Sequence, residues 1–271
     1  MATEMSCPNQ QLFWQSSIGI GISAGIFLVP IIGHPKALGN ETLWPVLVGV
    51  SGLPSALYLI SSWWIPESPY YLLRKGKVED AADALRKLRI NKKDVIKAEI
   101  EIIRGEIKDI PNVGIKVIVS TSQYRKQLFA VILLHSNYML VGFNHVAMFS
   151  DIVFAQAGIP LHLVTFASIG VFGVSFIAAI FGSKVVGKFG PLKVTLVSNA
   201  VIIFSIALFT ATRATSHLAP TILPYITIVA VGVFLIVWTG GLNVALFPLF
   251  MNYTIEATRV TVLAYDSVVF W

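Results

Sequence analysis

The stretch IPESPYYLLRKGKVEDAADALRKLR, residues 65–89, passes within a few residues from the end of an apolar segment into a charged, helix-forming one. Pro-Glu-Ser-Pro stands at the junction, and proline cannot supply the backbone N–H that a continuing helix needs. The junction therefore indicates that a membrane-spanning helix ends here and that an amphipathic helix follows outside the bilayer.

The composition supports a membrane protein. Hydrophobic residues make up 55% of the 271-residue chain, charged residues make up 13%, and the mean hydropathy is +0.75. A soluble chain of this length needs more charge to cover its surface. The single cysteine, Cys7, excludes an internal disulfide. A net charge of +6 does not indicate a nucleic-acid partner, because most of the basic residues gather in one segment.

Apolar runs predict six transmembrane helices, because a helix of about 20 residues crosses a hydrocarbon core of about 30 Å. A seventh run begins near Val260. The predicted fold class is an all-α polytopic membrane protein with an amphipathic helical segment between the second and third spans. The runs cover residues 12–33, 43–65, 127–154, 162–186, 192–212 and 222–250.

The basic residues predict the orientation. Residues 66–126 hold 14 of the 20 Lys and Arg residues, and positively charged loops stay in the cytoplasm. Alternating the spans from there leaves only Lys36 and Arg213 outside. The sequon Asn40-Glu41-Thr42 then lies outside, where it can be glycosylated, whereas the sequon at Asn252 lies inside. Both sequons can equally be chance matches.

The cytoplasmic segment contains two apolar stripes at helical spacing, with charges on the other faces. We expect two surface helices that lie beneath the membrane domain with the apolar stripes facing it. The alternative is a solvated charged linker. The stripes comprise Val78, Ala81, Ala82, Leu85 and Leu88, and then Ile96, Ile100, Ile103 and Ile107.

The opening stretch resembles a motif of the sugar porter family of the major facilitator superfamily, in particular the animal facilitative hexose transporters. There, Pro-Glu-Ser-Pro-Arg after the sixth helix is followed by GK.EEA..AL..LR, and only the arginine differs here, as Tyr70. GFNHVAMFSDIVFAQAGI, residues 142–159, is similar to the seventh-helix GINAVFYYS..IFEKAGI. VVGKFGPLK, residues 185–193, resembles VVDRFGRR after the eighth helix, and LFWQSSIGIGI, residues 12–22, resembles the fifth helix.

The resemblance implies that the six spans are helices five to ten of a transporter of this family. Residues 1–65 would hold the last two helices of the N-terminal bundle, and residues 66–126 the cytoplasmic linker. Residues 127–271 would hold four helices of the C-terminal bundle and the start of a further one. A chain of this kind is a fragment or a shortened paralogue, and it would need self-association to work at half length.

The candidate ligand is a small sugar or polyol, whose hydroxyls need donors and acceptors on several faces. Amide side chains supply both. Gln15 and Asn144 align with family positions that contact sugar, and Asn144 lies beside Gly142, where a helix breaks easily. Asn137 and Asn243 are candidates by residue type. For all four, the alternative is a hydrogen bond between helices.

Several departures from the family weaken the implied sugar site. Tyr138-Met139 replaces a glutamine pair, Ser175 an asparagine, and Phe247 a tryptophan. Trp238 falls at an aromatic position, where it would stack on a sugar or simply fill the bundle. The tenth helix has lost most of its prolines, so that only Pro248 remains to kink it, and we expect a stiffer gate.

The family's cytoplasmic charge network is also reduced. Glu67, Lys188, Lys193 and Arg259 remain, whereas Tyr70 and other substitutions remove its further charges. We therefore expect a weaker bias towards the outward-open state, because exposed ion pairs contribute about 0 to 1 kcal/mol each.

Three features limit the chemistry. We find no carboxylate deep in the six spans, which favours facilitated diffusion over proton symport. The sequence shows no phosphate-binding glycine loop, so no cofactor is expected. The histidines lack paired metal-ligand spacing, so no metal site is expected. They are His34, His135, His145, His162 and His217.

Two functions remain open. The first is transport of a hexose or related polyol across the plasma membrane by alternating access. The second is a non-transporting sugar sensor or an inactive membrane paralogue. An enzyme is not expected. The implied partners are a small-molecule sugar and the lipid bilayer.

The orientation can be tested by protease protection in sealed right-side-out vesicles. Residues 66–126 should resist protease added outside, and Asn40 should be the glycosylated sequon, because the basic residues are so unevenly distributed. External cleavage between Lys75 and Lys108, or an endoglycosidase-sensitive sugar on Asn252, would contradict the predicted topology.

Overall fold

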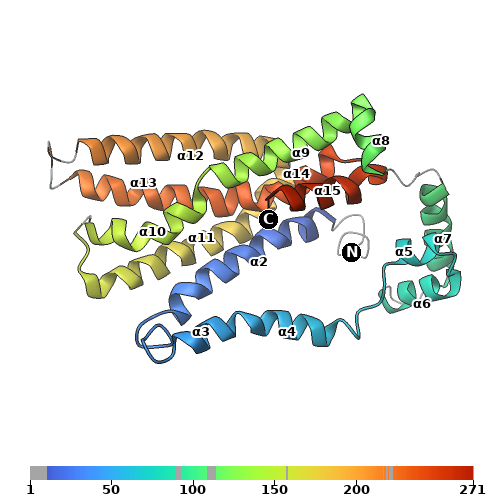
Figure 1. Cartoon of the computed structure of the whole chain (residues 1–271), viewed down its shortest axis with the longest axis horizontal. Coiled ribbons are helices and arrows are strands. Elements are labelled where there is room, and N and C mark those ends of the chain that lie inside the picture. Colours follow the sequence, from blue (N-terminus) through green and yellow to red (C-terminus); the bar gives the residue numbers. More distant parts are fainter. Residues whose placement is uncertain are drawn as a thin grey trace.

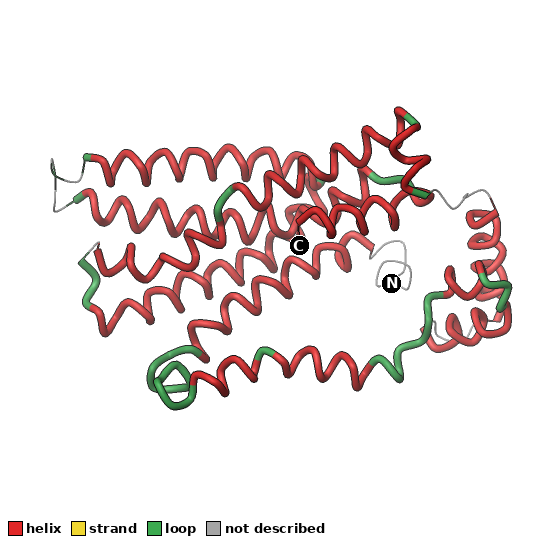
Figure 2. The backbone as a smooth tube through the Cα atoms, in the orientation of Figure 1, coloured by secondary structure: helices red, strands yellow, loops and turns green. Residues whose placement is uncertain are grey.

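The structure is a computed structural model of the chain that describes residues 11–88, 93–108, 114–156, 158–215, 217, 219 and 222–270. These residues form helices and connecting loops with no strand (Figure 1, Figure 2). Six of the described helical segments are long and apolar enough to cross a membrane. The predicted all-α polytopic membrane fold is therefore confirmed.

The helix bounds follow the predicted spans closely. The first span is α2 (Gln11–Ile32), and the second is α3 (Trp44–Val50) with α4 (Gly52–Ser61). The remaining helices are α5 (Pro69–Arg74), α6 (Val78–Leu88), α7 (Lys93–Lys108), α8 (Ile115–Ser120), α9 (Ser122–Leu140), α10 (Phe143–Gln156), α11 (Leu161–Phe189), α12 (Pro191–Ala214), α13 (Leu223–Val237), the π-helical turn η2 (Trp238–Asn243), α14 (Val244–Tyr253) and α15 (Glu256–Phe270).

The predicted third span is broken, as its glycine suggested. Helix α9 ends at Leu140, and α10 begins at Phe143. Between them Gly142 has a φ of 82°, a conformation that residues with a Cβ rarely adopt. The break changes the direction of the chain in the middle of the span and brings Phe143 into the core.

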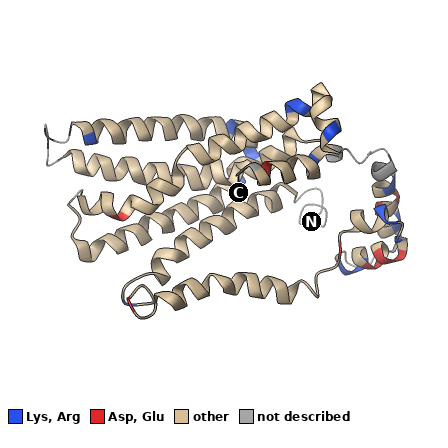
Figure 3. Cartoon of the chain, in the orientation of Figure 1, with Lys and Arg blue, Asp and Glu red and all other residues tan. Residues whose placement is uncertain are grey.

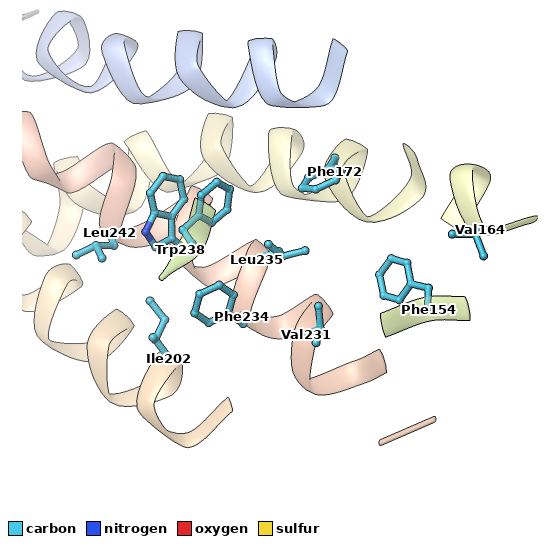
Figure 4. Packing of buried hydrophobic residues seen from close by; sticks show 10 residues of the cluster. Phe154, Val164, Phe172, Ile202, Val231, Phe234, Leu235, Trp238 and Leu242 are labelled. Atoms are coloured by element: carbon cyan, nitrogen blue, oxygen red, sulfur yellow. The ribbon is translucent and has the colours of Figure 1, made fainter. Parts of the chain in front are cut away.

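Apart from the span formed by α3 and α4, which lies away from the others in Figure 1, the long helices pack side by side into one bundle. Helix α2 lies against α11 and α14, and α12 lies against α13. The largest apolar core is formed by α10–α13 and η2, and Figure 4 shows Trp238, Phe234, Leu235 and Leu242 within it. Residues far apart in the sequence thus meet around the η2 turn.

Glycines allow the closest helix contacts. A Cβ on Gly182 of α11 would lie 1.8 Å from the carbonyl oxygen of Gly240 in η2. A Cβ on Gly19 of α2 would lie 2.8 Å from the carbonyl oxygen of Asn243. In both places the neighbour is backbone and cannot move aside cheaply, so these contacts require glycine.

The helices of the charged segment pack on one another, which corrects the expectation that their apolar stripes face the membrane domain. Helices α5, α6 and α7 contact each other and bury a shared apolar core beside the bundle (Figure 1). When the apolar stripes of two helices face each other, each stripe buries the other, and neither needs the membrane domain to cover it. Most of the charged residues outside the bundle lie on these helices (Figure 3). The core consists of Leu72, Leu73, Ala81, Ala84, Leu85, Ile96, Ile100 and Ile103.

The contact between α11 and η2 can be tested with a matched pair of glycine variants. Gly182→Ala should destabilise the protein by about 1–3 kcal/mol or more, because its Cβ overlaps the Gly240 backbone. Gly170→Ala on the same helix meets nothing within 4 Å and should be neutral or slightly stabilising. Thermal unfolding of the detergent-purified chain measures both. Equal midpoints for the two variants would contradict the close contact.

Candidate sugar-binding site

The last predicted span is interrupted by the π-helical turn η2, which runs through WTGGLN. Such turns widen the helix by one residue and often occur at functional sites. The Thr239 hydroxyl donates to the carbonyl oxygens of Leu235 (2.8 Å) and Ser175 (3.3 Å) and so ties the turn to α11. The π turn interrupts regular α-helix in this span in addition to Pro248, which lies inside α14.

An aromatic cluster lies where η2 meets the α9–α10 break. The rings of Phe143 and Trp238 stack with centroids 3.6 Å apart and an interplanar angle of 11°. The Tyr138 ring lies 4.9 Å from Trp238. Gly142 makes this arrangement, because its positive φ turns the chain between Tyr138 and Phe143.

Asn243, the last residue of η2, joins this cluster to α2. Its Nδ2 donates to the carbonyl oxygen of Gly19 at 2.8 Å and to the hydroxyl of Ser23 at 3.2 Å. Its Oδ1 accepts a hydrogen bond from the Tyr138 hydroxyl at 3.0 Å. One buried amide thus links α2, α9 and η2, and we call Tyr138, Phe143, Trp238 and Asn243 the aromatic–amide site.

One donor in this site lacks an acceptor. The indole Nε1 of Trp238 is buried, and it makes no hydrogen bond within the described part of the chain. Buried N–H groups nearly always have an acceptor, which can be a ligand. A ligand hydroxyl that accepts from Nε1 would satisfy this group.

The other predicted amides are placed separately. Gln15 is half-buried on α2, one turn before Gly19, and Asn144 is exposed in the first turn of α10. No hydrogen bond joins these two side chains among the described residues, and their role in binding stays a prediction. Asn137 donates to Asn199 Oδ1 of α12 at 3.3 Å, the helix-to-helix contact that was the alternative for it.

The four residues of the predicted charge network lie at helix ends. Glu67 is in the loop before α5, and Lys188 holds its Nζ 5.4 Å from the Phe189 ring. Lys193 lines a groove of about 560 Å³ between α11, α12 and η2. The Arg259 guanidinium donates to the hydroxyl and carbonyl oxygens of Thr254 at 3.4 and 3.3 Å. Their role as a gate stays a prediction.

Tyr71 and Glu67 both affect the pKa of Lys75, the residue that follows α5. The pKa of Lys75 is raised, mainly by a hydrogen bond with Tyr71, and Glu67 adds a smaller attraction for the charged amine.

Asn40, the predicted glycosylation position, is half-buried in the loop before α3. Its Oδ1 accepts from the backbone N–H of Leu43 at 2.8 Å and from Thr42.

Sequence reasoning missed two parts of this arrangement. Tyr138 was interpreted as a loss, but its hydroxyl supplies the polar contact to Asn243. The second missed part is Asp266 of α15, which is buried and contacts His135 of α9 at 2.6 Å. Asp266 lies beyond the six recognised runs, and its partner is 131 residues away in sequence.

The fold is that of the major facilitator superfamily. The superfamily's proton:xylose symporter XylE, bound to 6-bromo-6-deoxy-D-glucose, matches with a TM-score of 0.76 at 18% identity, over 98% of this chain and 55% of that chain. The partially occluded inward-open form of XylE from E. coli matches with a TM-score of 0.71 at 18% identity, over 98% of this chain and 56% of that chain.

The family follows from the sequence match. The profile described as "Sugar (and other) transporter" matches residues 2–271, so the chain belongs to this family, as the motifs had indicated. Among curated relatives, facilitated glucose transporter member 5 of Mus musculus is 32% identical over 219 residues, 79% of this chain and 43% of its own length. Member 9 of Pongo abelii is 28% identical over 213 residues, 78% of this chain and 38% of its own length. The chain thus spans less than half the length of these relatives.

The hydrogen bond between Tyr138 of α9 and Asn243 of η2 can be tested by removing the tyrosine hydroxyl. Tyr138→Phe should destabilise the protein by about 1–3 kcal/mol, because it leaves the Asn243 carbonyl oxygen buried without its donor. Tyr225→Phe, an exposed position on α13, should change nothing measurable. Chemical unfolding in mixed micelles, followed by circular dichroism, compares them. Equal free energies of unfolding for both variants would show that this hydrogen bond does not stabilise the fold.

Proposed function

We propose that the chain carries a hexose or related polyol through the membrane by facilitated diffusion and alternating access, with the sugar held at the aromatic–amide site. The observation that supports this most is the buried, unpaired indole N–H of Trp238 beside the Asn243 amide. The names of the relatives, facilitated glucose transporters, favour the same class of solute.

The chemistry of the aromatic–amide site suits a sugar. Flat aromatic faces accept the apolar C–H face of a pyranose, and the amide, phenol and indole supply donors and acceptors for its hydroxyls. Tyr138 and Asn243, which hydrogen-bond to each other, would form hydrogen bonds with sugar hydroxyls instead. Because α2 and η2 meet at this point, a sugar there would lie between the two bundles that move during alternating access.

The roles expected from the sequence fit this function. Residues 1–65 and 127–271 contribute to the two bundles, and residues 66–126 form the cytoplasmic linker between them. Glu67, Lys188, Lys193 and Arg259 contribute to the cytoplasmic gate, and Asn40 is the external glycosylation position. The protein acts in the plasma membrane and is not an enzyme. A chain that works at this length does so by self-association.

The alternative is a non-transporting sugar sensor or an inactive paralogue. One observation favours it: Tyr138-Met139, Ser175 and Phe247 replace polar or aromatic family positions. The Ser175 hydroxyl donates to Val171 O of its own helix at 2.8 Å, so it is already occupied. A sensor would bind sugar and not carry it.

Proteoliposomes that contain the full 271-residue chain separate these functions. A transporter should give saturable uptake of radiolabelled hexose that excess unlabelled hexose blocks and that an imposed pH gradient does not drive uphill. Sugar binding without uptake would favour the sensor. Absence of both binding and uptake would contradict the proposed function.

Binding can be assigned to particular amides by equilibrium dialysis on folded, purified protein. Gln15→Ala, Asn144→Ala and Asn243→Ala should each weaken hexose binding about 2- to 12-fold, because one net hydrogen bond contributes about 0.5–1.5 kcal/mol. Asn252→Ala, an exposed position at the end of α14, serves as the control and should bind normally. Unchanged affinity in Gln15→Ala and Asn144→Ala would assign those two residues to packing.

A further inference from the structure

A histidine and an aspartate form a buried pair between two helices. His135 Nδ1 of α9 and Asp266 Oδ2 of α15 are 2.6 Å apart. Their side chains retain 13% and 4% of their exposure. The second carboxylate oxygen, Oδ1, is also buried, and within the described part of the chain it makes no hydrogen bond.

The surroundings of the pair are mainly apolar. The rings of Phe250 and Tyr138 lie 5.9 and 6.2 Å from the His135 ring, and Val262 is fully buried on α15. Arg259 precedes Asp266 by about two helical turns, or roughly 10 Å, and its guanidinium bonds Thr254. The titratable groups on the elements packed here are Tyr138, Tyr124, Arg125 and Lys126 on α9, Lys116 on α8, Tyr253 on α14, and Glu256, Arg259 and Tyr265 on α15.

We propose that His135 and Asp266 form a proton-binding site that holds α15 against α9. A pair with one proton to share has no net charge, as imidazolium with carboxylate or as imidazole with carboxylic acid. Removing that proton leaves a buried negative charge, and adding a second leaves a buried positive charge. Either change is costly in an apolar interior, so the contact favours the singly protonated pair.

Proton binding is therefore linked to the contact between the helices. When α15 moves away and water reaches both groups, an imidazole titrates near pH 6.5 and a carboxylate near pH 3.9, as in model peptides. Above about pH 6.5 the separated groups hold no proton, whereas the closed pair holds one. The contact should then weaken by up to tenfold per pH unit above about pH 6.5, and should change little between about pH 4 and 6.5.

The pair is close to the aromatic–amide site but does not depend on it. Tyr138 follows His135 by three residues, one turn further along α9, and donates to Asn243. A shift of α9 that separates the pair would also move this tyrosine. The proton site itself can be measured without sugar, so its test is independent of the proposed function.

The first measurement is the NMR signal of the imidazoles in the full chain labelled at histidine Cε1, with His135 assigned by its loss in His135→Gln. At pH 7.5 the His135 signal should be that of a proton-sharing or charged imidazole. In Asp266→Asn the His135 signal should become neutral. A His135 signal of an ordinary neutral imidazole at pH 7.5 in the native chain would overturn the proposal.

The second measurement needs no variant of the pair, so it remains decisive if Asp266→Asn fails to fold. Amide hydrogen exchange of α15 in the native chain, corrected for intrinsic rates, should lose up to tenfold protection per pH unit between about pH 7 and 8.5. The control variant is Asp151→Asn, which removes a carboxylate that accepts a hydrogen bond from Ser168 between α10 and α11. Its α15 should lose protection with pH as in the native chain. Protection that does not change with pH in the native chain would contradict the proton site.

Discussion

The contact between α2 and η2 positions the groups of the proposed sugar site. Within a membrane, backbone and side-chain polar groups need partners inside the protein. The amide of Asn243 meets this need for η2 by bonding to Gly19 O and Ser23, and it can do so only because Gly19 lets the backbones approach. The same amide holds Tyr138 of α9, so one residue orders three helices.

Two interruptions of regular helix bring the residues of the aromatic–amide site together. The break at Gly142 places Phe143 on the face of Trp238, and the π turn places Trp238 and Asn243 together at one end of α13. Helix interruptions at membrane depth are tolerated where surrounding protein satisfies the freed groups, as Thr239 does by bonding to Leu235 and Ser175. The aromatic and amide groups are therefore held in place by contacts within the protein.

The sequence predicted the spans, the charged segment and the break at Gly142, because hydropathy and glycine chemistry are local properties. It did not predict the π turn, which depends on the contact between Thr239 and α11. The inward packing of α5–α7 was missed because one stripe cannot reveal which surface covers it. Asp266 and His135 were not paired, since 131 residues separate them and only the fold brings α15 beside α9.

The most direct test of the central claim is photolabelling of the full chain by a hexose that carries a diazirine, followed by peptide mapping. If sugar binds where α2 meets η2, label should appear on η2 and on the α9–α10 break, near Trp238 and Phe143, and excess unmodified hexose should abolish it. Label confined to α5–α7, or label on η2 that unmodified hexose does not displace, would contradict the assignment of the sugar to this site.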